Sequence, residues 1–211
     1  MMNDQEKRFA SPTARSTRRL VLILGGARSG KSTFAERLAL NSDRSVAFIA
    51  TALASDADMQ NRIARHRAAR PDSWHTIEEP LYLAKAVPQG AAHADVLLLD
   101  CMTTWLGNWL FSQEGADQLD DAAISALHYD SALREVDALL QAAASLDASK
   151  TLIIVTNEVG LGIVPAYALG RIYRDVLGLV NQRIAAAASQ VYLMVAGLGV
   201  DIKRLHEEAA I

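Results

Sequence analysis

The octapeptide GGARSGKS at residues 25–32 constrains the fold of this chain more than any other stretch. It follows the apolar run LVLIL at residues 20–24 and precedes the helical pattern TFAERLAL at residues 33–40. The spacing fits GxxxxGK[ST], in which successive backbone N–H groups surround phosphate oxygens and the lysine reaches the terminal phosphates. A helix that begins there adds unpaired N–H groups and the positive end of its dipole. The order of the segments therefore predicts a strand, a phosphate-binding loop and a helix, against the alternative of a glycine-rich turn without a ligand.

The polar side chains of the predicted loop have distinct tasks. Lys31 would stabilise charge on a transferred phosphoryl group, and Ser32 would offer a hydroxyl ligand to Mg²⁺. Asp100 closes the apolar run DVLLLD, the usual place for a second Mg²⁺ contact, either direct or through water. The alternative role of Asp100 is to cap the helix that follows. The residues predicted to contact phosphate are Gly25, Gly26, Ala27, Arg28, Ser29, Gly30, Lys31 and Ser32.

Short apolar runs alternate with helical patterns along the chain. Continuous runs indicate strands that are buried on both faces, and the alternation indicates a mostly parallel sheet with helices on both sides, hence the α/β class. In such sheets ligands collect at the carboxyl ends of the strands. The expected strands are at 20–24, 45–50, 95–100, 151–156 and 191–196, and the expected helices at 31–41, 56–69, 102–112, 120–146 and 166–188.

Length, charge and cysteine content further limit the number of domains, the partners and the cellular compartment that we expect. A chain of 211 residues, 51% of them hydrophobic, is long enough for one α/β core, so we expect a single catalytic domain over 20–211 and a disordered polar tail over 1–19. The formal net charge of -3 gives no reason to expect a nucleic-acid partner. The single cysteine, Cys101, favours a reducing, cytosolic compartment. No membrane span is expected, because no apolar stretch reaches about 20 residues. No secretory signal is expected, because residues 1–19 lack an apolar h-region.

A polar stretch, TNEVG, follows the fourth apolar run. It would bring Thr156, Asn157 and Glu158 to the same sheet edge as the phosphate-binding loop. Side chains there can orient a nucleophile or contact phosphate. A turn rich in polar residues is an equally good reading of the same letters.

The segment DADMQNRIARHRAARPDSW predicts a helix that ends before Pro71. Successive steps of four residues would place Arg62, His66 and Arg70 on one face. Flanking guanidinium groups lower the pKa of a histidine and keep its imidazole neutral, so it can attack a bound phosphate and form a phosphoramidate. From spacing alone, a solvated basic helix face is the commoner explanation.

Several of these stretches together resemble the bifunctional adenosylcobinamide kinase and adenosylcobinamide-phosphate guanylyltransferase family of cobalamin biosynthesis. The resemblance extends over residues 20–203 and rests on GGARSGKS, RIARHRAARP, LLLDCMTTWLGN, TNEVGLGIVP and GRIYRDVLGLVNQRIAAAASQVYLMVAGLGVDIK. The last two stretches are the most specific, since phosphate-binding loops occur in many unrelated enzymes. The family implies a three-layer, RecA-like P-loop NTPase fold and a homotrimer.

The resemblance also implies two reactions. ATP or GTP phosphorylates the aminopropanol hydroxyl of adenosylcobinamide, and GTP then donates GMP to that phosphate. His66 matches the histidine that carries GMP in the family, and Arg65 stands where some relatives have another histidine. Glu78 is suited to accept hydrogen bonds from guanine N1–H and its amino group, and Asp100 replaces a glutamate of relatives. The residues expected on the guanine nucleotide are Thr51, Ala52, Leu53, Arg67, Ala68, Ala69, Arg70, Glu78 and Asp100.

Two alternative functions stay open at this point. One is a small-metabolite kinase of the phosphate-loop type in which His66 only contacts phosphate. The other is a GTP-binding regulator without turnover, against which stands the absence of the NKxD base-recognition motif from the sequence. Label from α-labelled GTP retained on the protein distinguishes the first, and nucleotide consumption with adenosylcobinamide distinguishes the second.

Overall fold

The computed structural model describes residues 19–53, 57–68, 70–112 and 122–209. Its centre is a seven-stranded sheet with the strand order β3-β2-β4-β5-β1-β6-β7. The strands from β3 to β6 in that order run parallel, and β7 pairs antiparallel with β6 at one edge. Their bounds are β1 Arg19–Gly25, β2 Val46–Ala50, β3 His75–Glu78, β4 Val96–Asp100, β5 Thr151–Val155, β6 Gln190–Val195 and β7 Leu198–Asp201.

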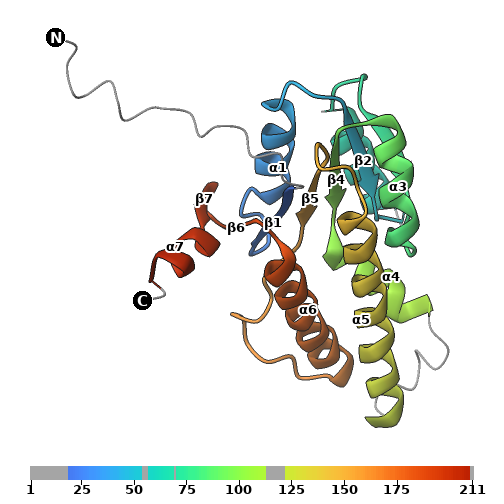
Figure 1. Ribbon diagram of the computed structural model, residues 1–211. Helices are drawn as coiled ribbons and strands as arrows, with labels where there is room; N and C mark the ends of the chain where they lie inside the picture. Colours follow the sequence, from blue (N-terminus) through green and yellow to red (C-terminus); the bar gives the residue numbers. More distant parts are fainter. Residues whose placement is uncertain (1–18, 54–56, 69, 113–121, 210–211) are drawn as a thin grey trace.

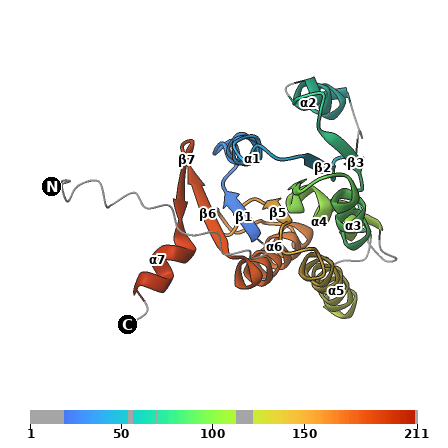
Figure 2. The ribbon, with the colours of Figure 1, turned by 45° about the horizontal axis from the view of Figure 1, so that its top comes forward.

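Helices cover the two faces of the sheet unequally (Figure 1). One face packs against α3, α4, α5 and α6, whereas α1 covers the other face (Figure 2). The remaining helices are α2, which follows β2, and α7, which follows β7. Their bounds are α1 Lys31–Leu40, α2 Ala57–Ala68, α3 Leu83–His93, α4 Met102–Ser112, α5 Ala122–Ala144, α6 Ala168–Ala187 and α7 Ile202–Ala209.

Alternation along β1 shows how the apolar runs are used. Val21 and Ile23 pack on the α1 side, whereas Leu22 and Leu24 pack on the side of α3 to α6. All four side chains are buried, as expected when a parallel sheet has apolar layers on both faces. The three-layer α/β prediction, with a mostly parallel sheet, is confirmed.

The five predicted strands and five predicted helices are present with small shifts at their ends. Two strands and two helices were not predicted: β3, α3, β7 and α7. The strands β3 and β7 have only four residues each and include exposed positions, so neither has a continuous apolar run. Helix α3 contains Pro88 in its interior, a residue that normally argues against a helix.

The parallel strands bring their carboxyl ends to one edge of the sheet. β1 ends at Gly25, β4 at Asp100 and β5 at Val155, so the segments after them meet there. None of the described helices is both long and apolar enough to cross a membrane. The predicted tail lies outside the described residues, apart from Arg19 at the start of β1.

Candidate nucleotide site

The segment between β1 and α1 wraps as a phosphate-binding loop does. Gly30 adopts a left-handed conformation (φ 93°) at the N-cap of α1, and its carbonyl accepts a hydrogen bond from the Phe34 N–H at 2.9 Å. Arg28 also has a positive φ of 57°. A side chain at position 30 would meet the Gly197 Cα at 3.2 Å, while the Gly197 N–H donates to the Ser29 carbonyl at 3.0 Å. The turn between β6 and β7 therefore braces this loop.

Lys31 and Ser29 keep their polar groups within the loop. The Lys31 ammonium donates to the Gly26 carbonyl at 2.6 Å, and the residue is only 7% exposed. The Ser29 hydroxyl is buried and has no hydrogen-bond partner among the described residues. A buried hydroxyl without a partner is costly, so this position fits a ligand oxygen that supplies the missing hydrogen bond.

A cleft of about 820 Å³ opens in front of the loop. Its walls come from the loop, from α1, from α2 through Arg65, and from the ends of β4 and β5. The side chains of Ser32 and Asp100 both line it, and oxygen donors of this kind suit Mg²⁺. Within the described ranges, no group of three or more His, Cys, Asp or Glu side chains could hold a metal ion by itself. The lining residues are Ala27, Arg28, Ser29, Gly30, Lys31, Ser32, Thr33, Glu36, Arg65, Asp100, Cys101, Thr103, Thr104, Val155 and Asn157.

Thr51 fixes the ends of β2 and β4 to each other. Its fully buried hydroxyl accepts from the Cys101 N–H and donates to the Cys101 carbonyl, both at 2.9 Å. The Thr51 N–H donates to the Asp100 carbonyl at 3.3 Å, and the Asn108 side chain donates to the Thr51 carbonyl at 2.7 Å. The Thr51 side chain was predicted to contact the nucleotide. In the structure its hydroxyl bonds the backbone of Cys101, the residue that follows Asp100.

Cys101 faces the cleft but is not poised as a nucleophile. Burial raises the pKa of its thiol, and the neighbouring Asp100 charge raises it further. The thiol Sγ lies 3.2 Å from the Thr104 hydroxyl. A thiol with a raised pKa stays protonated near neutral pH.

The polar residues after β5 form a network with α4 and α6. The Thr156 hydroxyl donates to Asn181 Oδ1 at 2.8 Å, and Asn181 Nδ2 donates to the Asn157 carbonyl at 2.9 Å. The Asn157 N–H donates to the Thr103 hydroxyl at 2.9 Å, and the Tyr173 hydroxyl donates to the Thr103 carbonyl at 2.8 Å. These contacts hold Asn157 at the wall of the cleft, where the sequence raised a phosphate contact as one of two possibilities.

Helix α2 contributes to the wall of the cleft. The side chain of Arg65 lines the cleft, and the position of His66 lies on the same helix. The side chains of Arg62 and His66 lie outside the described part of the chain, as does Ala69 in full. The shared helical face predicted for Arg62 and His66 therefore stays a prediction.

The prediction that Arg70 lies on that helical face is wrong, because α2 ends at Ala68. The Arg70 guanidinium instead lies over the Phe48 ring, with its central carbon 3.2 Å from the ring centroid, and 3.7 Å from a Glu36 carboxylate oxygen. Burial lowers its pKa, while Glu36 and Asp100 act in the opposite direction. A stacked guanidinium beside a carboxylate is a stable arrangement for a half-buried arginine.

Of the residues expected on the guanine nucleotide, Ala52, Leu53 and Glu78 lie at the carboxyl ends of β2 and β3, and Arg67 lies on α2. Glu78 and Arg67 are exposed, and the Arg67 guanidinium nitrogen is 4.0 Å from a Glu78 carboxylate oxygen. Ala52 and Leu53 follow β2 on the same edge. None of these four residues, nor Gly25, Gly26, Thr51, Ala68 or Arg70, lines the cleft.

Several cleft residues were missed from the sequence. Thr103 and Thr104 belong to the first turn of α4, and Thr33 and Glu36 to α1. Only their position in the sequence could have predicted them. They lie near the start of helices that follow the strands, and the carboxyl ends of the strands form the ligand-binding edge of the sheet. Residue type alone carries no such information for a threonine or a glutamate on a helix.

The sequence of this chain is similar to one known family and to proteins within it. Residues 21–202 match the family model described as cobinamide kinase / cobinamide phosphate guanyltransferase. The bifunctional adenosylcobalamin biosynthesis protein CobP of Pseudomonas aeruginosa is 44% identical over 86% of this chain and 96% of its own length. The bifunctional adenosylcobalamin biosynthesis protein CobU of Escherichia coli is 41% identical over 87% of this chain and 99% of its own length.

A solved structure supports the fold independently of sequence. A prototypical ATPase from the type III secretion system of pathogenic bacteria superposes with a TM-score of 0.51 and 11% identity. The superposition covers 92% of this chain and 60% of that chain, and shows a common fold. Because the family model spans nearly the whole described sheet and its helices, the chain belongs to the cobinamide kinase / cobinamide phosphate guanyltransferase family.

Proposed function

We propose that this chain phosphorylates adenosylcobinamide with ATP or GTP and then transfers GMP from GTP to the product, giving adenosyl-GDP-cobinamide. The observation that carries the proposal is the convergence of three parts on one cleft: the phosphate-binding loop, Asp100 and α2. Arg65, which lines the cleft, belongs to α2, the helix that bears His66. A cytosolic location remains the expectation from cysteine usage.

In the first reaction, the substrate hydroxyl oxygen attacks the γ-phosphorus, the bond to the bridging oxygen breaks, and the hydroxyl proton is lost to solvent or base. Catalysis of this step is mainly positioning and charge stabilisation. Lys31 supplies a positive charge at the terminal phosphates, and the loop N–H groups supply hydrogen bonds. Ser32 and Asp100 would hold Mg²⁺, which offsets the negative charge of the phosphates when bound.

In the second reaction, a neutral His66 nitrogen attacks the α-phosphorus of GTP and pyrophosphate leaves. A phosphate oxygen of adenosylcobinamide phosphate then attacks the same phosphorus, and the P–N bond breaks to free the imidazole. Arg65 is placed to contact phosphate oxygens during both steps, since it lines the cleft. Glu78 would select guanine by accepting two of its N–H groups, after exchanging its exposed contact with Arg67.

We also propose self-association into a homotrimer. Its support is an apolar surface on the outer hairpin and the last helix, where Val195, Leu198, Val200 and Leu205 are exposed. Helix α7 has no buried residue of its own, and β7 is an edge strand with unpaired backbone groups. Molar mass in solution, measured by light scattering, tests this proposal.

The decisive experiment for the enzyme is incubation with α-labelled GTP and Mg²⁺ in the absence of any corrinoid. Label should appear on His66, resist alkali and be lost in acid, as a P–N bond requires. His66→Ala should lose this label and the guanylyl transfer while keeping much of the kinase activity. Retention of label in His66→Ala would place the guanylyl group on another residue and contradict the role of His66. Absence of label from the wild type would leave the small-metabolite kinase as the better account. Failure to consume nucleotide with adenosylcobinamide would favour the regulator.

A further inference from the structure

The loop between β5 and α6, which begins beside the cleft-lining Asn157, exposes apolar side chains. Leu161 is 88% exposed, Ile163 97%, Val164 60% and Tyr167 68%. Most isolated surface apolar residues need no explanation, but a contiguous group beside a binding cleft usually marks a binding surface. We infer that this loop, residues 161–167, is the docking surface for the corrin macrocycle of the substrate; the inference rests on the proposed function.

The loop is continuous with the phosphate site. The Glu158 N–H donates to the Gly25 carbonyl at 3.0 Å, which ties the start of this loop to the start of the phosphate-binding loop. Asn157, the residue before, lines the cleft. A molecule lying on the loop can therefore reach the terminal phosphates with a short arm. Cobinamide has this shape, because its reacting hydroxyl is at the end of an aminopropanol arm.

The cleft itself leaves no room for the macrocycle. Its volume of about 820 Å³ has to accept a nucleoside triphosphate, and its lining is mostly polar. Cobinamide with its amide side chains has more atoms than the nucleotide, so its macrocycle has to lie outside the cleft, where the methyl groups of the ring can contact an apolar wall. The base-binding side offers the exposed charges of Arg67 and Glu78 instead.

The loop is built to keep its shape before any substrate arrives. The Arg171 guanidinium donates to the Ala166 carbonyl at 2.7 Å and to the Pro165 carbonyl at 3.2 Å. The Gly160 N–H donates to the Glu158 carboxylate at 2.6 Å. Such preorganisation lowers the ordering cost of binding.

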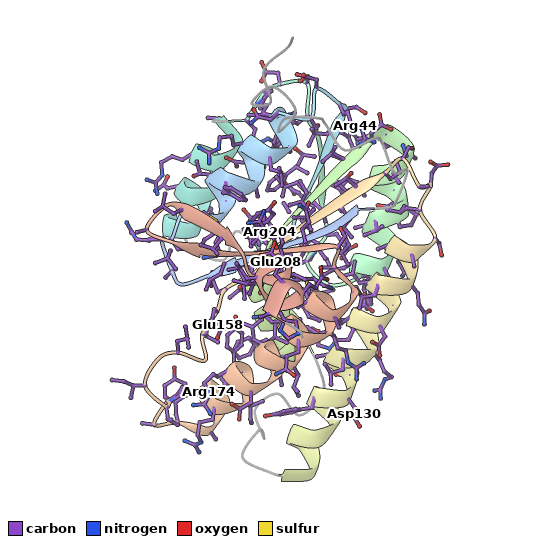
Figure 3. The ribbon with its side chains drawn as sticks, turned by 60° about the vertical axis from the view of Figure 1, so that its left-hand side comes forward. Arg44, Asp130, Glu158, Arg174, Arg204 and Glu208 are labelled. Atoms are coloured by element: carbon purple, nitrogen blue, oxygen red, sulfur yellow. The ribbon has the colours of Figure 1, made fainter. Side chains whose placement is uncertain are left out.

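Packing at the start of α6 also fixes the end of the loop. Gly170 lies against Tyr167 and Pro165 so closely that an added Cβ would be 2.7 Å from the Tyr167 ring. Arg174 pairs with its neighbour Asp175, with 2.8 Å between nitrogen and oxygen, so it does not place a free charge on the apolar surface. Figure 3 shows the loop standing away from the body between Glu158 and Arg174, with Arg204 and Glu208 of α7 on a separate part of the molecule.

The test substitutes the two most exposed side chains, Leu161→Ser and Ile163→Ser, singly and together. The KM for cobinamide should rise about tenfold for each change, because an apolar contact is lost in substrate and transition state alike. The kcat and the KM for GTP should stay at the wild-type values. Leu40→Ser is the matched control, since Leu40 is 48% exposed at the end of α1 and away from the carboxyl ends of the strands.

A second substrate separates docking from chemistry. Phosphorylation of 1-amino-2-propanol, the arm without the ring, should be equally slow in the wild type and in the double variant. Labelling by α-labelled GTP should also be unchanged.

The outcomes against the inference are distinct. If the wild-type chain does not phosphorylate cobinamide, the proposed function fails and the docking surface with it. If the wild type is active and the double variant keeps the wild-type KM for cobinamide, only the docking surface is overturned. A double variant with a changed molar mass and an unchanged KM would show that the loop is an interface between copies of this chain.

Discussion

The central carbon of the Arg70 guanidinium lies 3.2 Å from the centroid of the Phe48 ring, and Arg70 is near the start of the segment that joins α2 to β3. Phe48 is buried in β2, so this contact attaches the segment after α2 to the α1 face of the sheet. Glu36 of α1 completes the contact with an ion pair at 3.7 Å. The helix that bears His66 is therefore anchored close to the phosphate-binding loop.

Arg70→Ala should lower the free energy of unfolding by about 1–2 kcal/mol, through loss of the cation–π contact and of side-chain packing. Urea denaturation followed by circular dichroism measures this. Arg37→Ala is the matched control, because Arg37 is exposed and its guanidinium carbon is 5.7 Å from the Phe34 centroid. Equal effects of the two substitutions would contradict the anchoring role.

Lys31→Ala should lower the rate of adenosylcobinamide phosphorylation by about 10²–10³-fold, because a positive charge aimed at the terminal phosphates is lost. The measurement is single-turnover transfer from γ-labelled ATP or GTP. Lys85→Ala serves as control, since Lys85 is exposed over the Tyr82 ring and belongs to α3. A Lys31→Ala variant with near wild-type turnover would remove Lys31 from the site.

Asn181→Ala should destabilise the fold by about 1–3 kcal/mol, because the Thr156 hydroxyl and the Asn157 carbonyl both lose a partner in a buried setting. Since Asn157 lines the cleft, the KM for the nucleotide should rise as well. Chemical denaturation and steady-state kinetics report the two effects separately. Gln182→Ala, an exposed neighbour on the same helix, should change neither quantity.

Cys101 offers a chemical probe of the cleft, because it is the only cysteine of the chain and lines the cleft. Its raised pKa predicts slow reaction with iodoacetamide near neutral pH. The rate should increase with pH past the ordinary range of a free thiol, since the thiolate forms only there. GTP with Mg²⁺ should protect it. Rapid labelling at pH 7, or labelling that ignores the nucleotide, would contradict this environment.

The sequence predicted the parts of this molecule that local patterns encode. Continuous apolar runs identified the buried strands, and GGARSGKS identified the loop after β1. Short or half-exposed elements such as β3 and β7 have no such pattern, and α3 contains a proline. β3 and β7 form because β2 and β6 provide neighbouring strands to pair with. Helix α3 is stabilised by the side chains that it buries in the core.

Side-chain roles that depend on distant contacts were harder to predict. Extending α2 as far as Arg70 was reasonable from spacing, but stacking on Phe48 competes with helix continuation. The family resemblance implied a nucleotide contact for Thr51, and in the structure its hydroxyl joins the ends of β2 and β4. Phe48, the partner of Arg70, and Cys101, the partner of Thr51, become neighbours of these residues only in the folded sheet. No local sequence pattern predicts such contacts.

The contact between Gly30 and Gly197 has a consequence for how the binding loop is assembled. The octapeptide is synthesised before β6, yet its brace comes from the turn after β6. Backbone atoms make this contact: a Cβ added at position 30 would lie 3.2 Å from the Gly197 Cα. Neither backbone can rotate away to make room. A nascent chain that stops before β6 would contain every letter of the motif and still lack the support that shapes it. The earliest recognisable signature in the sequence is thus among the last features of the molecule to be completed.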